Sequence, residues 1–285
     1  MVKRFIGRTV RLAGVGLLVA VGLTFQATVH PTSSQQGPTV SIEDGQAPPA
    51  GTDVTRLSAL GVSDPALCGF AVDVEYDRDV TYPMGCAPDP EDKFDVELCN
   101  PYYWADSTES VRVVAGTGSP EGVTGDIPLA DITWCALGSP GESSDLHVEV
   151  VSLSGCEVTP AEIAPVAVQD GVNVIGTGTA PVGTDRDGDG FSDCAEMYLG
   201  TDGYAACPYA SWHDAWPLDQ DNNGTILVVG DVTKFGGNTF KAATDMTCSA
   251  FPHGACKRLD LDANGMILVV GDVTRYTGKL FETCQ

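Results

Sequence analysis

Basic residues are scarce in this sequence. Its 285 residues include 15 lysines and arginines against 39 aspartates and glutamates, which gives a formal net charge of -24 at pH 7. Proteins grip the phosphate backbone of a nucleic acid with clustered lysine and arginine, and none cluster here beyond the extreme N-terminus. The composition therefore argues against a nucleic-acid partner and favours cations as ligands.

Catalytic motifs are missing as well. The sequence has no Gly-x-Ser-x-Gly elbow, no His-Glu-x-x-His, no phosphate-binding glycine-rich loop and only four histidines. His213 and Asp214 are adjacent, but adjacency does not make a triad, and a histidine in a linker is expected to be solvated. Carboxylate pairs are too common in so acidic a chain to indicate a glycosidase. We therefore expect a protein that is not an enzyme.

Long apolar runs occur only near the N-terminus. Residues 1–29 carry four basic residues followed by the apolar run Leu12–Phe25, the layout of a secretory signal. The run is short for a membrane span, which needs about 20 apolar residues, although extension through Thr9 and Val10 leaves a signal anchor open. We expect a secreted or cell-surface protein that contacts a membrane only if this segment stays uncleaved.

All ten cysteines follow that segment, which favours disulfides in an oxidising compartment over thiolate metal sites. Short spacing suggests pairing Cys86 with Cys99, Cys194 with Cys207 and Cys248 with Cys256. Closing a loop of this size contributes about 3 kcal/mol in the chain-entropy model. Five cysteines precede residue 160 and five follow it, so either one bridge joins the halves or each half leaves one unpaired.

The middle of the chain predicts a β-sandwich. Residues 30–53 are rich in Pro, Ser, Gln, Gly and Thr and are expected to be a flexible linker. Residues 54–182 then carry β-rich runs separated by turn residues, with no long helical period. The expected strands are Phe70–Tyr76, Val111–Ala115, Leu129–Leu137, Leu146–Leu153 and Val166–Val174. The chain should be mainly β, with an antiparallel sandwich and a small α part near the C-terminus.

Several segments of this region resemble the cohesin-type β-sandwich. They are Phe70-Ala-Val-Asp-Val-Glu-Tyr-Asp77, Cys86, Cys99-Asn-Pro101, Val111-Arg-Val-Val and Gly125-Asp-Ile-Pro-Leu-Ala-Asp-Ile-Thr-Trp134. Cohesins and related carbohydrate-binding modules share a jelly-roll-like sandwich. The resemblance implies a binding role, toward a dockerin or toward polysaccharide, and does not choose between them.

One aromatic group bears on that choice. Tyr102, Tyr103 and Trp104 follow Cys99-Asn-Pro101 in an expected loop, where exposed rings would form a platform for stacking sugars. The alternative is that the three rings cap the core of the sandwich. A carbohydrate-binding accessory protein of a polysaccharide-degradation system is therefore the second functional hypothesis.

Asp185–Glu196 matches the calcium-loop pattern in full, with a short helix expected to end near Gly200. Ca²⁺ prefers six to eight oxygen ligands, and Gly190 permits the sharp turn at position 6. The expected ligands are Asp185, Asp187, Asp189, the Phe191 carbonyl, Asp193 (directly or through water) and Glu196. Without a cation these closely spaced carboxylates would repel one another. Residues 183–216 are thus expected to form a calcium loop and a disulfide-pinned linker.

Residues 217–285 contain an internal repeat. The segment from Leu218 to Phe235 returns, with few changes, as Leu259 to Tyr276. Each copy begins as a calcium loop, and apolar residues at helical spacing follow it. The expected ligands are Asp219, Asp221, Asn223, Thr225 and Asp231 in the first copy and Asp260, Asp262, Asn264, Met266 and Asp272 in the second. Because Ile-Leu-Val-Val is strongly β-prone, a pair of acidic turns followed by short strands is the alternative.

Two loop-helix units in tandem resemble a dockerin, and two departures from that family matter. Glycines 230 and 271 stand at loop position 12, where the family carries a carboxylate, and Asp231 and Asp272 follow one place later. Either the loop is one residue longer, or fewer ligands leave calcium weakly bound. The recognition pair at positions 10 and 11 is Val-Val in both copies instead of Ser/Thr, which makes a standard partner doubtful.

Together these patterns predict a secreted, non-catalytic modular protein whose cofactor is Ca²⁺. Its expected partner is a cohesin- or dockerin-bearing protein, in docking at the cell surface or in an extracellular assembly. Self-association of the sandwich with the repeat is a third hypothesis. Chelation should melt residues 185–285 while the sandwich persists.

Overall fold

The computed structural model describes residues 37–105, 108–157, 162–163, 166–178, 183–210, 212–248 and 256–284, which all belong to one structural unit. The expected signal segment lies outside them. No helix in these described ranges is both long and apolar enough to span a membrane.

The strands are β1 (Thr39–Ile42), β2 (Gly45–Ala47), β3 (Thr52–Glu75), β4 (Thr81–Pro88), β5 (Val96–Ala105), β6 (Thr108–Gly116), β7 (Val123–Ala136), β8 (Ser143–Gly155), β9 (Ala167–Gln169) and β10 (Gly171–Ile175).

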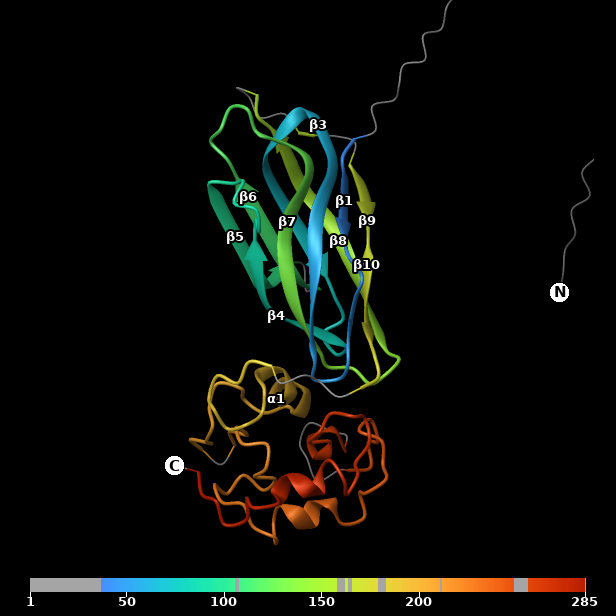
Figure 1. The fold of residues 1–285 in the computed structure, drawn as a ribbon, viewed down its shortest axis with the longest axis vertical. Helices are drawn as coiled ribbons and strands as arrows, with labels where there is room; N and C mark the ends of the chain where they lie inside the picture. Colours follow the sequence, from blue (N-terminus) through green and yellow to red (C-terminus); the bar gives the residue numbers. More distant parts are fainter. Residues whose placement is uncertain are drawn as a thin grey trace, which may run out of the picture. The chain divides into compact units, whose positions relative to one another are not determined.

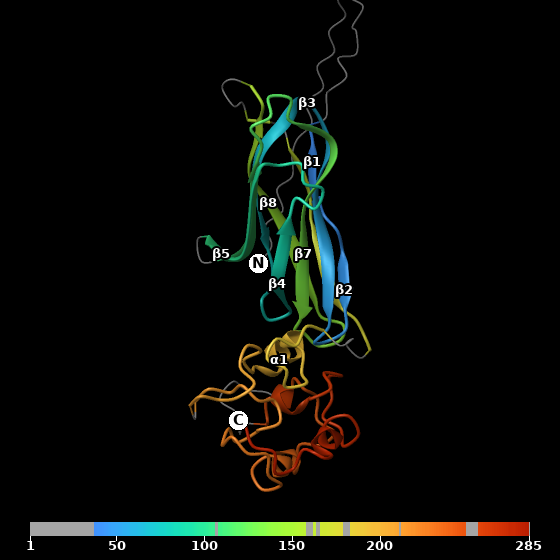
Figure 2. The same ribbon diagram turned by 60° about the vertical axis from the view of Figure 1, so that its left-hand side comes forward.

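The long strand β3 organises the sheet. Its first half pairs with β1 and β7, and its second half pairs with β6 and β8, with register shifts between Leu57 and Gly69 where the strand changes neighbours. The remaining strands extend these two halves: β4 joins β7, β5 joins β6, and β10 joins β8. The sheet is therefore folded over along β3 into two layers, as Figures 1 and 2 show.

One hydrophobic core fills the space between the layers. It takes alternate side chains from both halves of the sheet, because successive residues of a strand point to opposite faces. Trp134 is fully buried in it, and its indole N–H donates to the Thr55 hydroxyl at 2.8 Å, which satisfies the one polar atom of the ring. Phe70 and Phe94 pack edge to face at 5.3 Å.

The expected strands are confirmed, and the mainly β fold with them. Residues 70–76 lie in β3, 111–115 in β6, 129–136 in β7 and 146–153 in β8, while the last expected strand divides into β9 and β10. The pairing is not wholly antiparallel, since β1 with β9 and β2 with β10 run parallel.

Two expectations about the N-terminal half are wrong. Residues 39–53 are not a flexible linker, because they form β1, β2 and the start of β3, held by backbone hydrogen bonds that composition does not reveal. Tyr102, Tyr103 and Trp104 lie in strand β5 instead of a loop. The side chains of these three residues are outside the described ones, so the sugar platform stays a prediction.

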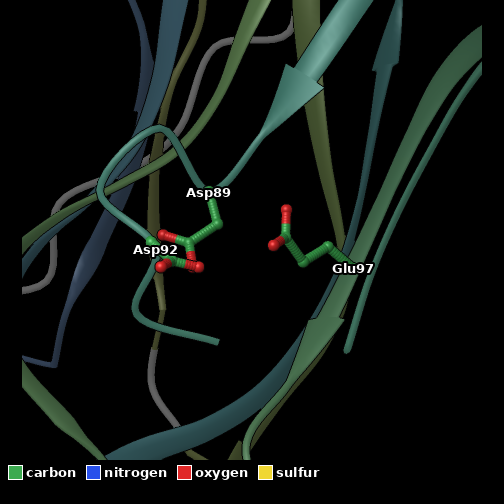
Figure 3. A group of neighbouring side chains, drawn as sticks. All are labelled: Asp89, Asp92 and Glu97. Atoms are coloured by element: carbon green, nitrogen blue, oxygen red, sulfur yellow. The ribbon is translucent and has the colours of Figure 1, made fainter. Parts of the chain in front are cut away.

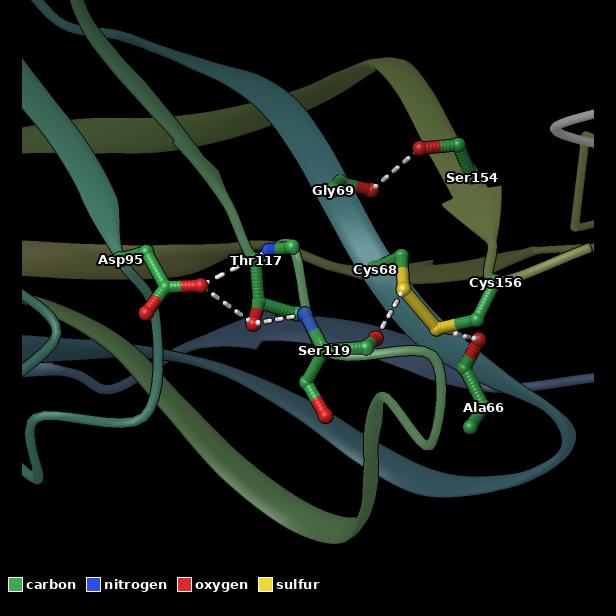
Figure 4. Close-up of a disulfide and its surroundings, with 9 residues drawn as sticks. Ala66, Cys68, Gly69, Asp95, Thr117, Ser119, Ser154 and Cys156 are labelled. Atoms are coloured by element: carbon green, nitrogen blue, oxygen red, sulfur yellow. Dashed lines mark hydrogen bonds between the residues drawn. A yellow bond between two sulfur atoms is a disulfide. The ribbon is translucent and has the colours of Figure 1, made fainter.

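Five disulfides link all ten cysteines. Cys86–Cys99 and Cys248–Cys256 are confirmed. The predicted Cys194–Cys207 bridge is wrong, because Cys194 pairs with Cys135 of β7 and Cys207 pairs with Cys284 at the chain end. Cys135–Cys194 is thus the one bridge that joins the two halves of the sequence. The fifth bridge, Cys68–Cys156, ties β3 to the end of β8 (Figure 4).

Within its described residues, the C-terminal half has little regular structure: a short helix and three four-residue 3-10 turns. These are α1 (Asp193–Leu199), η1 (Val232–Phe235), η2 (Cys256–Leu259) and η3 (Val273–Tyr276). Gly200 caps α1 in the left-handed conformation, as expected. The α-helix predicted after each repeat loop is wrong, and the 3-10 turns η1 and η3 stand there instead. Gly230 and Gly271 have φ of 112° and 110°, which an α-helix does not accommodate. The alternative of short strands is also wrong, since 226–229 and 267–270 form no strand.

The two repeats are joined by backbone hydrogen bonds. The Phe281 N–H donates to the Ile226 carbonyl at 2.8 Å, and the Ile226 N–H donates to the Glu282 carbonyl at 3.0 Å. The equivalent bonds run the other way, from Phe240 to Ile267 at 2.7 Å and from Ile267 to Lys241 at 2.9 Å. The segment that follows each 3-10 turn therefore pairs with the loop of the other repeat. Phe235 and Tyr276 pack edge to face at 5.9 Å in the shared core.

Candidate metal centres

Three groups of carboxylates gather in the C-terminal half of the chain. In each group, one oxygen of every member lies within 4.8 Å of the others. The groups are Asp185, Asp187 and Asp189; Asp219, Asp221 and Asp231; and Asp260, Asp262 and Asp272. All of these residues were expected as ligands from the sequence, and the structure brings together those expected to share an ion.

The first aspartate of each loop fixes the loop backbone. Both oxygens of Asp219 accept backbone N–H groups, from Asn223 at 3.1 Å and Gly224 at 2.6 Å. The same pattern occurs at Asp260, with Asn264 at 3.1 Å and Gly265 at 2.8 Å. Asp185 accepts from Gly188 at 2.7 Å and from Gly190 at 3.1 Å. These bonds wrap the loop backbone around the carboxylate of its first aspartate.

The side chain at loop position 5 fixes position 7 in all three loops. Its Oδ1 atom accepts the N–H of the residue two places on, which is an Asx turn. The pairs are Asp189 with Phe191 at 2.8 Å, Asn223 with Thr225 at 2.9 Å and Asn264 with Met266 at 2.9 Å. The carbonyls of Phe191, Thr225 and Met266 remain predicted ligands.

The two repeat loops are one residue longer than the usual pattern. Asp231 and Asp272, at position 13, join the aspartates at positions 1 and 3. Asp231 accepts the N–H groups of Gln220 at 2.7 Å and Leu227 at 2.6 Å, which binds the end of the loop to its beginning. Of the two alternatives drawn from the sequence, the longer loop is the one the geometry favours.

Steric crowding explains why glycine stands at position 12 of both repeat loops. A Cβ atom at Gly230 would lie 2.2 Å from Asp221 Oδ2, and one at Gly271 would lie 2.0 Å from Asp262 Oδ2. Real Cβ atoms do not approach an oxygen so closely. The glycine that looked like a missing ligand in the sequence thus makes room for the position 3 carboxylate.

The first loop closes differently. Glu196 is fully buried on α1, and its Oε2 atom has no hydrogen-bond partner among the described residues. It lies outside the 4.8 Å grouping of its three aspartates. Asp193 contacts Arg186 twice: its Oδ1 atom accepts the Arg186 backbone N–H at 2.9 Å, and its Oδ2 atom lies 3.0 Å from Arg186 Nε. A role of Asp193 as a ligand stays a prediction.

The residues present fit a hard divalent cation. Asp187 Oδ2, Asp189 Oδ2, Glu196 Oε2 and Asp262 Oδ1 are buried and have no hydrogen-bond partner in the described part of the chain. Leaving a charged oxygen buried and unpaired costs several kcal/mol. Because every donor in the three groups is an oxygen, with no imidazole or thiolate, these clusters could hold a metal ion of the Ca²⁺ or Mg²⁺ type.

Comparison with known proteins finds solved structures of similar fold whose sequences are only distantly similar to this one. No family model and no curated protein matches the sequence. Solved structures that resemble it include cohesins. A type I cohesin from Pseudobacteroides cellulosolvens is 16% identical, with a TM-score of 0.42 over 51% of this chain and 96% of its own. A non-cellulosomal cohesin from Archaeoglobus fulgidus is 13% identical, with a TM-score of 0.39 over 49% and 91%. A cohesin from Acetivibrio cellulolyticus, solved in complex with a dockerin, is 12% identical, with a TM-score of 0.43 over 49% and 99%.

Tyr198, Arg258 and His213 make further side-chain contacts in this half of the chain, and the sequence singled out only His213 among them. The Tyr198 hydroxyl of α1 donates to Asp260 Oδ2 at 2.7 Å, so the helix of the first loop touches a predicted ligand of the third. Arg258, which is 5% exposed, donates to both Asp214 oxygens at 3.0 Å and to the Trp216 carbonyl at 3.0 Å. The expectation of a solvated His213 is wrong, because its ring is buried and lies 2.8 Å from Asp202 Oδ2. These contacts join residues that are not near neighbours in the sequence, so no local spacing pattern predicts them.

Burial raises the pKa of several loop carboxyls above their usual values, including Asp189, Glu196 and Asp272. Desolvation is the largest cause throughout, and neighbouring carboxylates add to it. The pKa of Glu196 rises from 4.5 to about 9, that of Asp272 from 3.8 to about 7, and that of Asp189 from 3.8 to about 6. A bound divalent cation favours the ionised form of each group. Ion binding near neutral pH should therefore release protons.

This electrostatic arrangement predicts that the ion-free protein loses stability as the pH rises. The folded state holds protons that the unfolded chain releases, so the contribution of Glu196 is complete below pH 4.5 and is lost as the pH rises toward about 9. Thermal unfolding of metal-stripped protein should show a lower melting temperature at pH 8.5 than at pH 5.5. Glutamine cannot ionise, so Glu196→Gln should reduce the difference in melting temperature between pH 5.5 and pH 8.5. An equal difference in the variant would contradict the role of Glu196.

Proposed function

We propose that this chain is a secreted, non-catalytic modular protein in which three calcium ions shape the C-terminal half into a docking surface. The observation that carries the proposal is the repeated loop geometry: three groups of oxygen donors, in each of which the first aspartate accepts two backbone N–H groups of its own loop. The first and third groups also contain buried oxygens without partners among the described residues. Ca²⁺ tolerates seven ligands and irregular geometry, whereas Mg²⁺ demands an octahedron. Calcium therefore suits these loops better.

The docking surface that we propose comprises the Val-Val pair of each repeat, Val228 with Val229 and Val269 with Val270. Val229 is 77% exposed and Val270 is 79% exposed, although valine is a residue normally buried. Each pair occupies positions 10 and 11 of its loop, just before the closing aspartate at position 13, so ion binding would set its position. Exposed apolar residues at a fixed place in both repeats favour binding to another protein.

The sequence resemblances indicate the kind of partner. The C-terminal repeat resembles a dockerin, for which a cohesin-bearing protein is the expected partner. The sandwich resembles a cohesin, for which a dockerin-bearing protein is expected. Because the recognition pair is apolar instead of Ser/Thr, we propose a partner with an apolar binding face. Polysaccharide and a second copy of this chain are the competing ligands.

Immobilised full-length protein tests this function against purified cohesins, dockerins and insoluble polysaccharides. We expect capture of a protein module in calcium and its loss in chelator. The double variant Val229→Asp with Val270→Asp should abolish capture while leaving calcium binding unchanged, because both side chains are exposed. The exposed Glu121→Gln serves as a control away from the repeats. Retention on a polysaccharide alone, or calcium-dependent dimers in light scattering, would replace the proposal with one of its competitors.

A further inference from the structure

A fourth group of carboxylates lies on the sandwich, in the connection from β4 to β5 and at the start of β5. One oxygen each of Asp89, Asp92 and Glu97 lies within 4.8 Å of the others. Figure 3 shows the carboxylates of Asp89 and Asp92 side by side, with that of Glu97 turned toward them. These residues belong to none of the three calcium-type loops, and their spacing follows no loop pattern.

Asp89 is buried with an oxygen that has no partner. Its side chain is 5% exposed, and its Oδ2 atom accepts the Phe94 N–H at 2.5 Å. Its Oδ1 atom has no hydrogen-bond partner in the described ranges. The basic residue next in sequence, Lys93, pairs with Glu91 at 2.5 Å. A buried carboxylate oxygen beside two further carboxylates is costly unless a cation neutralises it.

The connection that carries the group is fixed on both sides. The Cys86–Cys99 disulfide closes the segment that contains all three acids. The Asp92 N–H donates to the Asp89 carbonyl at 3.0 Å, which sets the turn between them. Phe94 is anchored in the core against Phe70. The three carboxylates are thus held together by contacts that do not depend on an ion.

A fourth acid in the same segment shows how a carboxylate there is satisfied without a metal. Asp95 Oδ2 accepts the Thr117 hydroxyl at 2.9 Å and the Gly118 N–H at 2.7 Å (Figure 4), and these bonds lower its pKa. Asp89 Oδ1 has no such donor in the part of the chain that the structure describes. The contrast within seven residues singles out the Asp89 group as the one that needs a cation.

We propose that Asp89, Asp92 and Glu97 form a separate divalent-cation site on the sandwich and that its ion is Ca²⁺. The donors are all carboxylate oxygens, which are hard ligands. Asp92 and Glu97 are exposed, so water can complete the six to eight ligands that Ca²⁺ takes. With only three protein side chains, the affinity should fall in the range of about 10⁻⁴ to 10⁻³ M typical of extracellular modules. The ion joins the end of β4 to the start of β5.

Hydrogen exchange of the full-length protein, read on peptides that cover residues 86–99, tests this site. We expect additional protection as Ca²⁺ rises from about 10⁻⁵ to about 10⁻³ M, a range above that which fills tighter loops. Asp92→Asn and Glu97→Gln should each remove this protection, because both are exposed and neither carries the fold. Glu91→Gln, an exposed acid of the same segment outside the group, should retain it.

Three results would overturn the proposal: no protection of this segment at millimolar Ca²⁺, unchanged protection in both Asp92→Asn and Glu97→Gln, or equal loss in Glu91→Gln. Equal protection by Mg²⁺ would overturn the choice of calcium. Peptides from residues 185–284 report on the three C-terminal loops in the same experiment. Failure of those loops to bind is therefore visible separately from failure of this site.

Discussion

Removing calcium should destabilise residues 185–284, so that they unfold at a lower temperature than the β-sandwich. The sandwich has a hydrophobic core of its own, whereas the second core takes most of its residues from the C-terminal half and adds Ala50, Cys135 and Leu137 from the end of the sandwich. An ion that binds only the folded state contributes about 2.7 kcal/mol when its concentration is a hundredfold above Kd. Three such ions contribute roughly 8 kcal/mol, comparable with the whole stability of a typical domain.

Hydrogen exchange with and without a calcium chelator measures this expectation along the chain. Peptides from residues 212–248 and 256–284 should lose protection, while those from β3, β7 and β8 should keep it. Calorimetry should resolve two transitions in chelator, of which only the lower moves when calcium returns. Mg²⁺ at the same concentration should restore little of the protection. A single transition unaffected by chelation would exclude a structural role for calcium.

Placing a methyl group at loop position 12 should destroy one calcium site. In Gly271→Ala the new Cβ would need the space of Asp262 Oδ2, and Gly230→Ala would displace Asp221 in the same way. The positive φ of each glycine adds about 1–3 kcal/mol of backbone strain. We expect each variant to bind one tight calcium ion fewer and to melt at a lower temperature in calcium.

Gly237→Ala separates these two effects. Gly237 also has a positive φ, of 78°, but a Cβ there meets nothing within 4 Å. The control should therefore lose some stability from backbone strain and keep every calcium ion. Calorimetric titration gives the number of ions bound by each variant. Full occupancy in both Gly230→Ala and Gly271→Ala would show that Asp221 and Asp262 are not ligands.

The loops were predictable from sequence because their chemistry is local. Aspartates at positions 1 and 3 with glycine at position 6 specify a turn in which the first aspartate accepts hydrogen bonds from residues close to it in the chain, as the bonds from Asn223 and Gly224 to Asp219 show. The alternation in 70–76 likewise specifies a strand with one buried face. In both cases the residues that determine the structure are neighbours in the chain.

Features that depend on distant contacts were not predictable. The spacing of Cys194 and Cys207 suggested a short loop, but α1 packs so that Cys194 meets Cys135, 59 residues away. Strands β1 and β2 are short and lie in a segment rich in Pro, Ser, Gln, Gly and Thr, and their structure depends on backbone bonds to β3 and β10 and on burial of Val40 and Ile42 in the core. The Asp89 group escaped notice because no periodic pattern marks it. Gly230 was misread because the carboxylate that requires it lies nine residues earlier.

The exchange of segments between the two repeats limits how this half of the chain can be divided. Each loop finds its backbone partners in the other copy, at Glu282 for Ile226 and at Lys241 for Ile267. A polypeptide with one copy could make the same bonds only by pairing with a second molecule of itself. The duplicated segment is thus the covalent equivalent of a homodimer, and a single-repeat ancestor or fragment would be expected to assemble as one.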